Sequence, residues 1–221
     1  SLLEANGAEK KDIEETIKKL EKRDIKISIK DIENLKKLFD ILNVKYIQAE
    51  GEADILCCNL YKEKIIDGCI SNDMDFLASG CGILLREYNR SDTIQEYNLA
   101  EALKNLNFTM AEFVDLCILF GCDYSNTIHK VGIKTAFKLI NELKSIEAII
   151  EKYSPKKYKI DESFNYKKAR DLLNQKIEIN ESIKSILHTP SKKLKLTDDN
   201  IKFIMENSSM KKKLIEKKMQ F

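Results

Sequence analysis

The pattern of apolar positions predicts a helix in the first part of the chain. Apolar side chains recur at helical spacing over residues 31–43, and Ser28 and Asp31 have the separation of a capping box. Five of these side chains form a stripe that we expect to face a core: Ile32, Leu35, Leu38, Phe39 and Leu42. Residues 1–24 are rich in Lys and Glu and predict a surface helix with a narrow apolar stripe.

Short apolar runs and helical patterns alternate over the next fifty residues. Residues 44–49 predict a strand, residues 52–64 a helix and residues 64–71 a second strand. A strand, a helix and a strand within about 30 residues are typical of a βαβ unit, whose two strands run parallel. The pattern further predicts one helical turn at 75–79. It also predicts two strands, at 83–88 and 93–97, on either side of a polar turn at 89–92.

From residue 98 onward the pattern predicts helices only, at 98–105, 109–121, 132–143, 145–153, 165–175, 198–207 and 210–219. In the second of these, Thr109 and Glu112 suit a capping box, and Gly121 suits the left-handed position that ends many helices. Its core-facing side chains are expected to be Phe113, Leu116, Cys117 and Phe120. The predicted fold class is therefore α/β, with a parallel-sheet core followed by a helical lobe.

Composition narrows the class of protein. The chain has 221 residues, 43% hydrophobic and 33% charged, so it can bury a core beneath a highly charged surface. Its net charge of +2 requires any nucleic-acid binding to come from local patches. No apolar run reaches the length of a membrane span, and only two histidines are present. Six cysteines without a Cys-x-x-Cys pair predict buried thiols in a reducing intracellular compartment.

Acidic residues follow three of the predicted elements. Glu52 and Asp54 come after the first strand, Asp73 and Asp75 come after the second, and Asp123 follows the long helix. Because ligands of open parallel sheets bind outside the carboxyl ends of the strands, we expect the first two pairs at one edge. An isolated aspartate in a turn more often bonds its own backbone, but two acidic pairs after consecutive strands favour a site.

Five carboxylates in one place would repel one another. Two unit charges about 5 Å apart cost roughly 3 kcal/mol at an effective dielectric constant of about 20. Such a group stays ionised only when cations occupy it, and all-oxygen ligands suit magnesium or manganese rather than zinc. Two divalent ions about 4 Å apart can activate water and stabilise the leaving oxygen of a phosphodiester.

A basic helix begins a few residues after Asp123. Gly132 opens it, and backbone N–H groups at a helix start favour phosphate. Lys130, Lys134 and Lys138 recur every four residues, so those in the helix can form one basic face. A solvated surface helix would carry the same pattern.

Four motifs keep their order and spacing along the chain. They are Tyr46-Ile-Gln-Ala-Glu-Gly-Glu-Ala-Asp54, Asn72-Asp-Met-Asp-Phe-Leu-Ala-Ser-Gly80, Cys117-Ile-Leu-Phe-Gly-Cys-Asp-Tyr124 and Val131-Gly-Ile-Lys-Thr-Ala136. Together they closely resemble the internal nuclease region of the XPG family, and within it the flap endonucleases. The resemblance runs from about residue 30 to residue 150 and continues weakly to the end.

The resemblance implies a PIN-like nuclease core and a structure-specific, magnesium-dependent enzyme. The family cuts 5′ flaps and other branched or nicked DNA in replication and repair, as an endonuclease or a 5′→3′ exonuclease. The implied catalytic metal ligands are Glu52, Asp54, Asp73, Asp75 and Asp123. The implied cofactors are two magnesium ions, for which manganese can substitute, and a potassium ion at the DNA-binding helix–two-turn–helix.

The resemblance also implies three parts of the chain. Residues 1–30 correspond to the end of a helical arch or a lead-in, residues 31–122 to the nuclease core, and residues 123–221 to a helical lobe. The helix–two-turn–helix falls on about 124–140, with implied DNA contacts from Lys130, Gly132, Lys134, Thr135 and Lys138. We expect a monomer in the nucleus of a eukaryote, or in the cytoplasm for a viral or prokaryotic protein. No sliding-clamp motif is visible at the C-terminus.

Two features depart from the family pattern. The turn that usually reads Gly-Ile-Gly is Lys130-Val-Gly132, and the segment with two further metal-binding aspartates and the DNA wedge has no counterpart in residues 1–30. Two alternatives therefore stay open. Glu52-Ala-Asp54 in place of Glu-Ala-Glu is compatible with a 5′→3′ exonuclease or a junction-cutting relative. A chain without those aspartates would serve as a non-catalytic branched-DNA-binding module or as half of a split nuclease.

Overall fold

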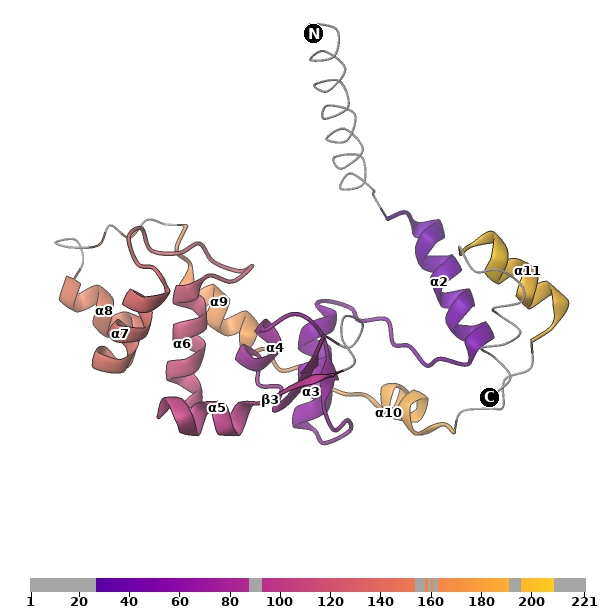
Figure 1. The fold of residues 1–221 in the computed structure, drawn as a ribbon, viewed down its shortest axis with the longest axis horizontal. Coiled ribbons are helices and arrows are strands. Elements are labelled where there is room, and N and C mark those ends of the chain that lie inside the picture. Colours follow the sequence, from indigo (N-terminus) through magenta and orange to yellow (C-terminus); the bar gives the residue numbers. More distant parts are fainter. Residues whose placement is uncertain are drawn as a thin grey trace, which may run out of the picture. The chain divides into compact units, whose positions relative to one another are not determined.

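The computed structural model describes residues 27–87, 93–153, 158, 160, 163–190 and 196–208 (Figure 1). These residues gather into two compact units, one from the residues up to Tyr46 and from Ile186 onward, the other from Ile47–Ser185. The helices predicted at 1–24 and 210–219 and the polar turn at 89–92 lie outside the described residues. The domain boundaries predicted from the sequence stay a prediction.

Two helices, α2 (Ile29–Leu42) and α11 (Asp198–Glu206), lie side by side in the first unit (Figure 1). The capping box predicted at the start of α2 is confirmed. The Asp31 N–H donates to Ser28 Oγ at 3.2 Å, and the Ser28 N–H donates to Asp31 Oδ2 at 2.8 Å. Two buried isoleucines of α11 make the small core of this unit with partly buried side chains of α2.

The stripe predicted on α2 is only partly directed at that core. Leu38 and Leu42 pack against it, but Ile32 and Leu35 are 43% and 48% exposed. No residue of α2 is fully buried. The periodicity correctly predicted a helix, but it could not say how much of the apolar face the neighbouring helix covers.

The second unit contains a three-stranded sheet. Its strands are β1 (Cys69–Ile70), β2 (Ile83–Arg86) and β3 (Gln95–Asn98), in that order across the sheet. β1 and β2 pair in parallel, and β2 and β3 pair antiparallel. The short helix α4 (Asp75–Ala78) lies in the crossover between β1 and β2.

The strand predicted at 44–49 is wrong. This segment has no ladder partner among the described residues, and the division between the two units falls inside it, between Tyr46 and Ile47. The parallel pair therefore joins β1 to β2 rather than the 44–49 segment to β1. The βαβ arrangement is present, but it sits one element later in the chain than the sequence pattern indicated.

The remaining helices follow the predicted pattern closely: α3 (Ala53–Lys62), α5 (Leu99–Leu106), α6 (Met110–Phe120), α7 (Ile133–Leu143), α8 (Ile146–Tyr153) and α9 (Tyr166–Leu173). A further helix, α10 (Glu181–His188), was not predicted. None of the helices in the described part of the chain is long and apolar enough to cross a membrane.

Helix α6 is the centre of the larger core and packs against α7 and α9 (Figure 1). Its predicted capping box is confirmed by a 2.6 Å bond from the Thr109 N–H to Glu112 Oε2. Leu116 is buried as predicted, but Phe120 is 39% exposed, because it is the last helical residue before the chain turns away. Gly121 ends the helix with φ +108° and ψ 131°, a positive φ outside the left-handed helical region.

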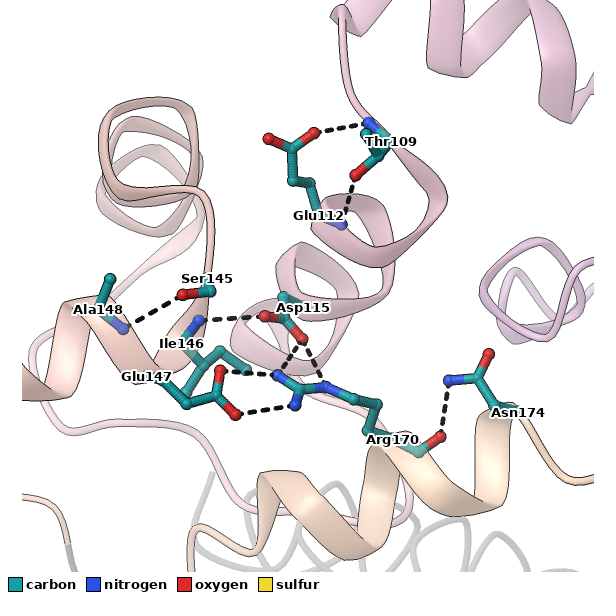
Figure 2. A network of polar contacts seen from close by, with 9 residues as sticks. All are labelled: Thr109, Glu112, Asp115, Ser145, Ile146, Glu147, Ala148, Arg170 and Asn174. Atoms are coloured by element: carbon teal, nitrogen blue, oxygen red, sulfur yellow. Dashed lines mark hydrogen bonds and ion pairs between the residues drawn. The ribbon is translucent and has the colours of Figure 1, made fainter.

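A buried carboxylate ties α6 to two other helices (Figure 2). Asp115 Oδ2 accepts the Ile146 N–H at 3.0 Å, which caps the start of α8. Asp115 Oδ1 accepts from the Nε and Nη2 of Arg170 on α9, at 3.0 and 2.7 Å. Arg170 also pairs with Glu147 through two bonds of 2.8 and 3.1 Å. This network fixes α8 and α9 on the helix that leads to Asp123.

Candidate functional site

Each of the two acidic pairs lies where irregular backbone leads into the start of a helix. Glu52 is the N-cap residue of α3, with φ −66° and ψ 121°, and Asp54 lies in its first turn. Asp73 lies in the loop after β1, and Asp75 begins α4. The Asp75 N–H donates to Asp73 Oδ1 at 2.9 Å, so the backbone of one aspartate orients the carboxylate of the other.

The fifth carboxylate comes from the turn after α6. Asp123 lies inside a tight turn that is closed by an isolated bridge between Cys122 and Ser125. Its side chain is exposed, in keeping with a residue that the preceding helix delivers to the surface.

The pKa values show that these carboxylates share one electrostatic neighbourhood. Burial raises the pKa of Asp54, and the charges of Asp73 and Glu52 raise it further. Burial likewise raises the pKa of Asp75, with added effects from Asp73, Asp123 and Asp54. Each of the five predicted residues is therefore coupled to at least one other, across α3, the loop after β1 and the turn after α6. The structure brings the predicted set together electrostatically.

Tyr124 belongs to the same neighbourhood and was not predicted as a site residue. Burial raises the pKa of its phenol, and the charges of Glu52, Asp75, Asp54 and Asp123 raise it further. Its place in the Cys117–Tyr124 motif was the available signal. Cys117, in the same motif, has a pKa raised to about 12, by burial first and then by Asp75.

The donor set suits a hard divalent cation. All five side chains are carboxylates, and their mutual repulsion is the kind that a bound Mg²⁺ or Mn²⁺ relieves. Among the residues that the structure describes, no three His, Cys, Asp or Glu side chains are already placed to hold a metal ion. The carboxylates thus influence one another electrostatically, but they are not arranged as a coordination sphere. Their roles as metal ligands stay a prediction.

A basic hollow of about 600 Å³ opens beside α7. Lys130, Lys134, Thr135 and Lys138, all predicted to contact DNA, line it together. The other lining residues are Leu139, Glu142, Tyr153 and Tyr158, which the sequence pattern did not single out. The lysines therefore lie along one concave surface rather than scattered over a solvated helix.

The start of α7 leaves backbone donors available at this surface. Gly132 is its N-cap residue and offers no side-chain cap, so the first N–H groups lack that partner. The backbone of Gly132 is ordinary (φ −86°), and a Cβ there would meet no atom within 4 Å. Neither the backbone nor the packing of this chain therefore requires glycine at position 132.

Lys130 replaces the first glycine of the family turn and keeps the backbone that glycine favours. Its φ is +67°, in the left-handed region. The substitution has therefore added a cation to the hollow without removing the turn.

Comparison with known proteins places the acidic motifs in one family. Residues 43–123 match the model of the XPG I-region, which contains all five carboxylates. These residues thus form an XPG I-region, and the resemblance to the XPG family seen in the motifs is confirmed.

Two curated relatives extend the match. Flap endonuclease 1 of Entamoeba histolytica is 41% identical over 162 residues, covering 72% of this chain and 43% of that protein. Flap endonuclease 1 of Caenorhabditis elegans is 38% identical over 168 residues, covering 74% and 44%. The chain therefore spans less than half the length of these two relatives.

Solved structures confirm the fold class. Flap endonuclease-1 from Methanococcus jannaschii aligns with a TM-score of 0.60 and 23% identity, covering 95% of this chain and 62% of that one. The junction-resolving enzyme GEN1, solved with product DNA and Mg²⁺, aligns with a TM-score of 0.56 and 19% identity, covering 82% and 50%. The α/β core with its added helices thus has the PIN-like fold of these nucleases.

Proposed function

We propose that this chain carries the catalytic carboxylates and the duplex-binding surface of a DNA nuclease. The nuclease is magnesium-dependent and structure-specific, and it cuts 5′ flaps or related branched DNA. The observation that carries the proposal is an XPG I-region with five carboxylates, in which the charges of Glu52, Asp73 and Asp123 raise the pKa of Asp54 or Asp75. Glu52, Asp54, Asp73, Asp75 and Asp123 would hold two divalent ions. Such ions supply an activated water and stabilise the leaving oxygen of a phosphodiester.

The basic hollow has a separate role in this proposal. Lys130, Lys134 and Lys138 would neutralise phosphates of duplex DNA, while the first N–H groups of α7 donate to a phosphate oxygen. A potassium ion beside this turn is proposed as well, because the GEN-1 structure solved with potassium has a related fold. We also propose that the protein works in a reducing compartment, which its six free cysteines support.

The direct test is cleavage of matched DNA substrates by the purified protein. A 5′ flap, a nicked duplex and a four-way junction, each labelled at its 5′ end, would be incubated with Mg²⁺ and, in parallel, with EDTA. We expect Mg²⁺-dependent cutting with the flap preferred. Preference for the junction would favour the junction-cutting relative, and tight binding without turnover would favour the DNA-binding module.

The lysines of the hollow give a prediction about affinity. Lys134→Ala should weaken duplex binding and reduce the slope of log K against log salt by about one, because one phosphate contact is lost. Binding would be measured by fluorescence anisotropy between low and moderate salt, in EDTA to prevent cleavage. Lys168→Ala on α9 is the matched control, since that exposed lysine does not line the hollow.

Gly132→Ala probes the same surface without changing its charge. A methyl group at position 132 has free space in the protein, so the melting temperature should stay the same while duplex affinity falls. An unchanged salt slope for Lys134→Ala, together with full affinity of Gly132→Ala, would show that DNA does not approach this hollow.

A further inference from the structure

Asn72 is anchored to the end of β2 from two sides. Arg86 Nη2 donates to the backbone oxygen of Asn72 at 2.9 Å, and the Glu87 N–H donates to Asn72 Oδ1 at 3.1 Å. One residue earlier, the Ser71 N–H donates to the Leu85 oxygen at 3.1 Å, which extends the parallel pairing of β1 with β2. These three bonds fix the beginning of the loop that carries the second acidic pair.

Two further hydrogen bonds connect this anchored part of the loop to the aspartates. The Asp73 N–H donates to Ser71 Oγ at 3.1 Å, and Asp73 Oδ1 accepts the Asp75 N–H at 2.9 Å. The direction of the Asp73 carboxylate thus depends on the loop backbone that Arg86 holds at Asn72. The chain of contacts runs without a gap from β2 to the start of α4.

Two unfavourable local features coincide at the anchoring residues. The Nε–H of Arg86 is buried and has no acceptor among the residues that the structure describes. Glu87 has φ +61°, a conformation that residues with a Cβ seldom adopt. Strained backbone concentrates at functional sites, and a buried donor without an acceptor calls for an explanation.

We propose that Arg86, acting through Asn72, is a positioning residue that sets the Asp73–Asp75 loop for divalent-metal binding. The proposal rests on the proposed function, because it assumes that these aspartates are metal ligands. Arg86 makes its contact with the loop backbone through Nη2, and its guanidinium lies over the Tyr97 ring, 5.8 Å from the ring centre. Partners that orient a metal ligand typically change metal affinity by about 10- to 100-fold when they are removed.

The test measures Mn²⁺ binding in the absence of DNA. Binding is monitored through the electron paramagnetic resonance signal of the free ion. Arg86→Met keeps the length of the side chain and removes its donors, so we expect about tenfold weaker Mn²⁺ binding. Arg86→Lys can donate a single bond to Asn72 and should fall between Arg86→Met and the parent protein. Lys168→Met is the matched control, because it likewise removes one positive charge, at an exposed position of α9 outside the acidic set.

A second measurement needs no metal. Amide hydrogen exchange at Asp75, whose N–H is bonded to Asp73, should become faster in Arg86→Met and stay unchanged in Lys168→Met. Parent-like Mn²⁺ affinity in Arg86→Met would overturn this inference and leave the proposed function intact. Equal weakening by Arg86→Met and Lys168→Met would also overturn it, since the loss of one positive charge would then explain both. Failure of the parent protein to bind Mn²⁺ would overturn the proposed function and the inference together.

Discussion

Asp123→Asn is expected to lower Mg²⁺-dependent cleavage of flapped DNA by more than about 100-fold. Loss of a residue that only orients a metal ligand costs up to about 100-fold, and loss of a ligand itself should cost more. The substitution keeps the size of the side chain and removes one negative charge from the turn after α6. That charge acts on Asp75, so its loss should also lower the pKa of Asp75 towards the ordinary value. Single-turnover cleavage at saturating DNA, with Mg²⁺ varied, would measure the loss.

The matched control is Asp67→Asn. Asp67 is exposed, lies shortly before β1 and does not act on the pKa of Asp54 or Asp75. It should leave cleavage unchanged, while DNA binding in EDTA should be retained by both variants. Full activity of Asp123→Asn would remove the turn after α6 from the site and with it the proposed set of five ligands.

The second large effect is expected on stability, from Asp115→Ala. This change leaves the Ile146 N–H and Arg170 without their shared acceptor (Figure 2). Removing one partner of a buried ion pair costs about 3–5 kcal/mol. For a chain of this size, that corresponds to a fall in melting temperature of roughly 10 °C, measurable by circular dichroism or calorimetry.

Glu147→Ala is the control on the other side of the same arginine. The Glu147 side chain is 48% exposed, so its pair with Arg170 should contribute less than about 1 kcal/mol. Burial raises the pKa of Asp115 despite the opposing effect of Arg170, which indicates that desolvation offsets much of the attraction. The double variant Asp115→Leu/Arg170→Met should therefore recover part of the loss. Equal effects of the two alanine variants would contradict the assigned importance of the buried carboxylate.

The elements with strong local signals were predictable from the sequence. Both capping boxes form as predicted, because Ser28 with Asp31 and Thr109 with Glu112 need only three residues of local geometry. The helix α10 was missed although its apolar positions recur at helical spacing; it has eight residues, and none of them is buried. Its signal was the side chain of Asn180, whose Oδ1 accepts the Ile183 N–H near the start of the helix.

Features that depend on partners distant in the sequence were not predictable. The apolar run at 44–49 met the local criteria for a strand, but a strand exists only when another strand pairs with it. Phe120 fitted the apolar period of α6 and still lies at the surface. Asp115, a charged residue in an apolar run, was a visible signal of a buried pair, but its partner lies 55 residues away.

The candidate site was predictable in its members more than in its geometry. The five carboxylates and the lysines of the hollow were named from motif spacing. In the structure, the carboxylates are related by their charges, and the lysines are related by the surface that they line together. The contact of Arg86 with Asn72 could not be inferred, since it depends on the register of two strands whose pairing the sequence did not reveal. The coordination of a metal depends on the ion as much as on the chain.

Lys130, with its left-handed backbone before α7, has to meet two opposing requirements. Glycine at position 130 would relieve a backbone penalty of roughly 1–2 kcal/mol, but it would remove one cation from the hollow. Arginine would retain the cation together with the penalty, and asparagine would ease the backbone at the expense of the charge. No natural side chain satisfies both demands, so variation at this single position trades robustness of the fold against the strength of electrostatic attraction to a polyanion.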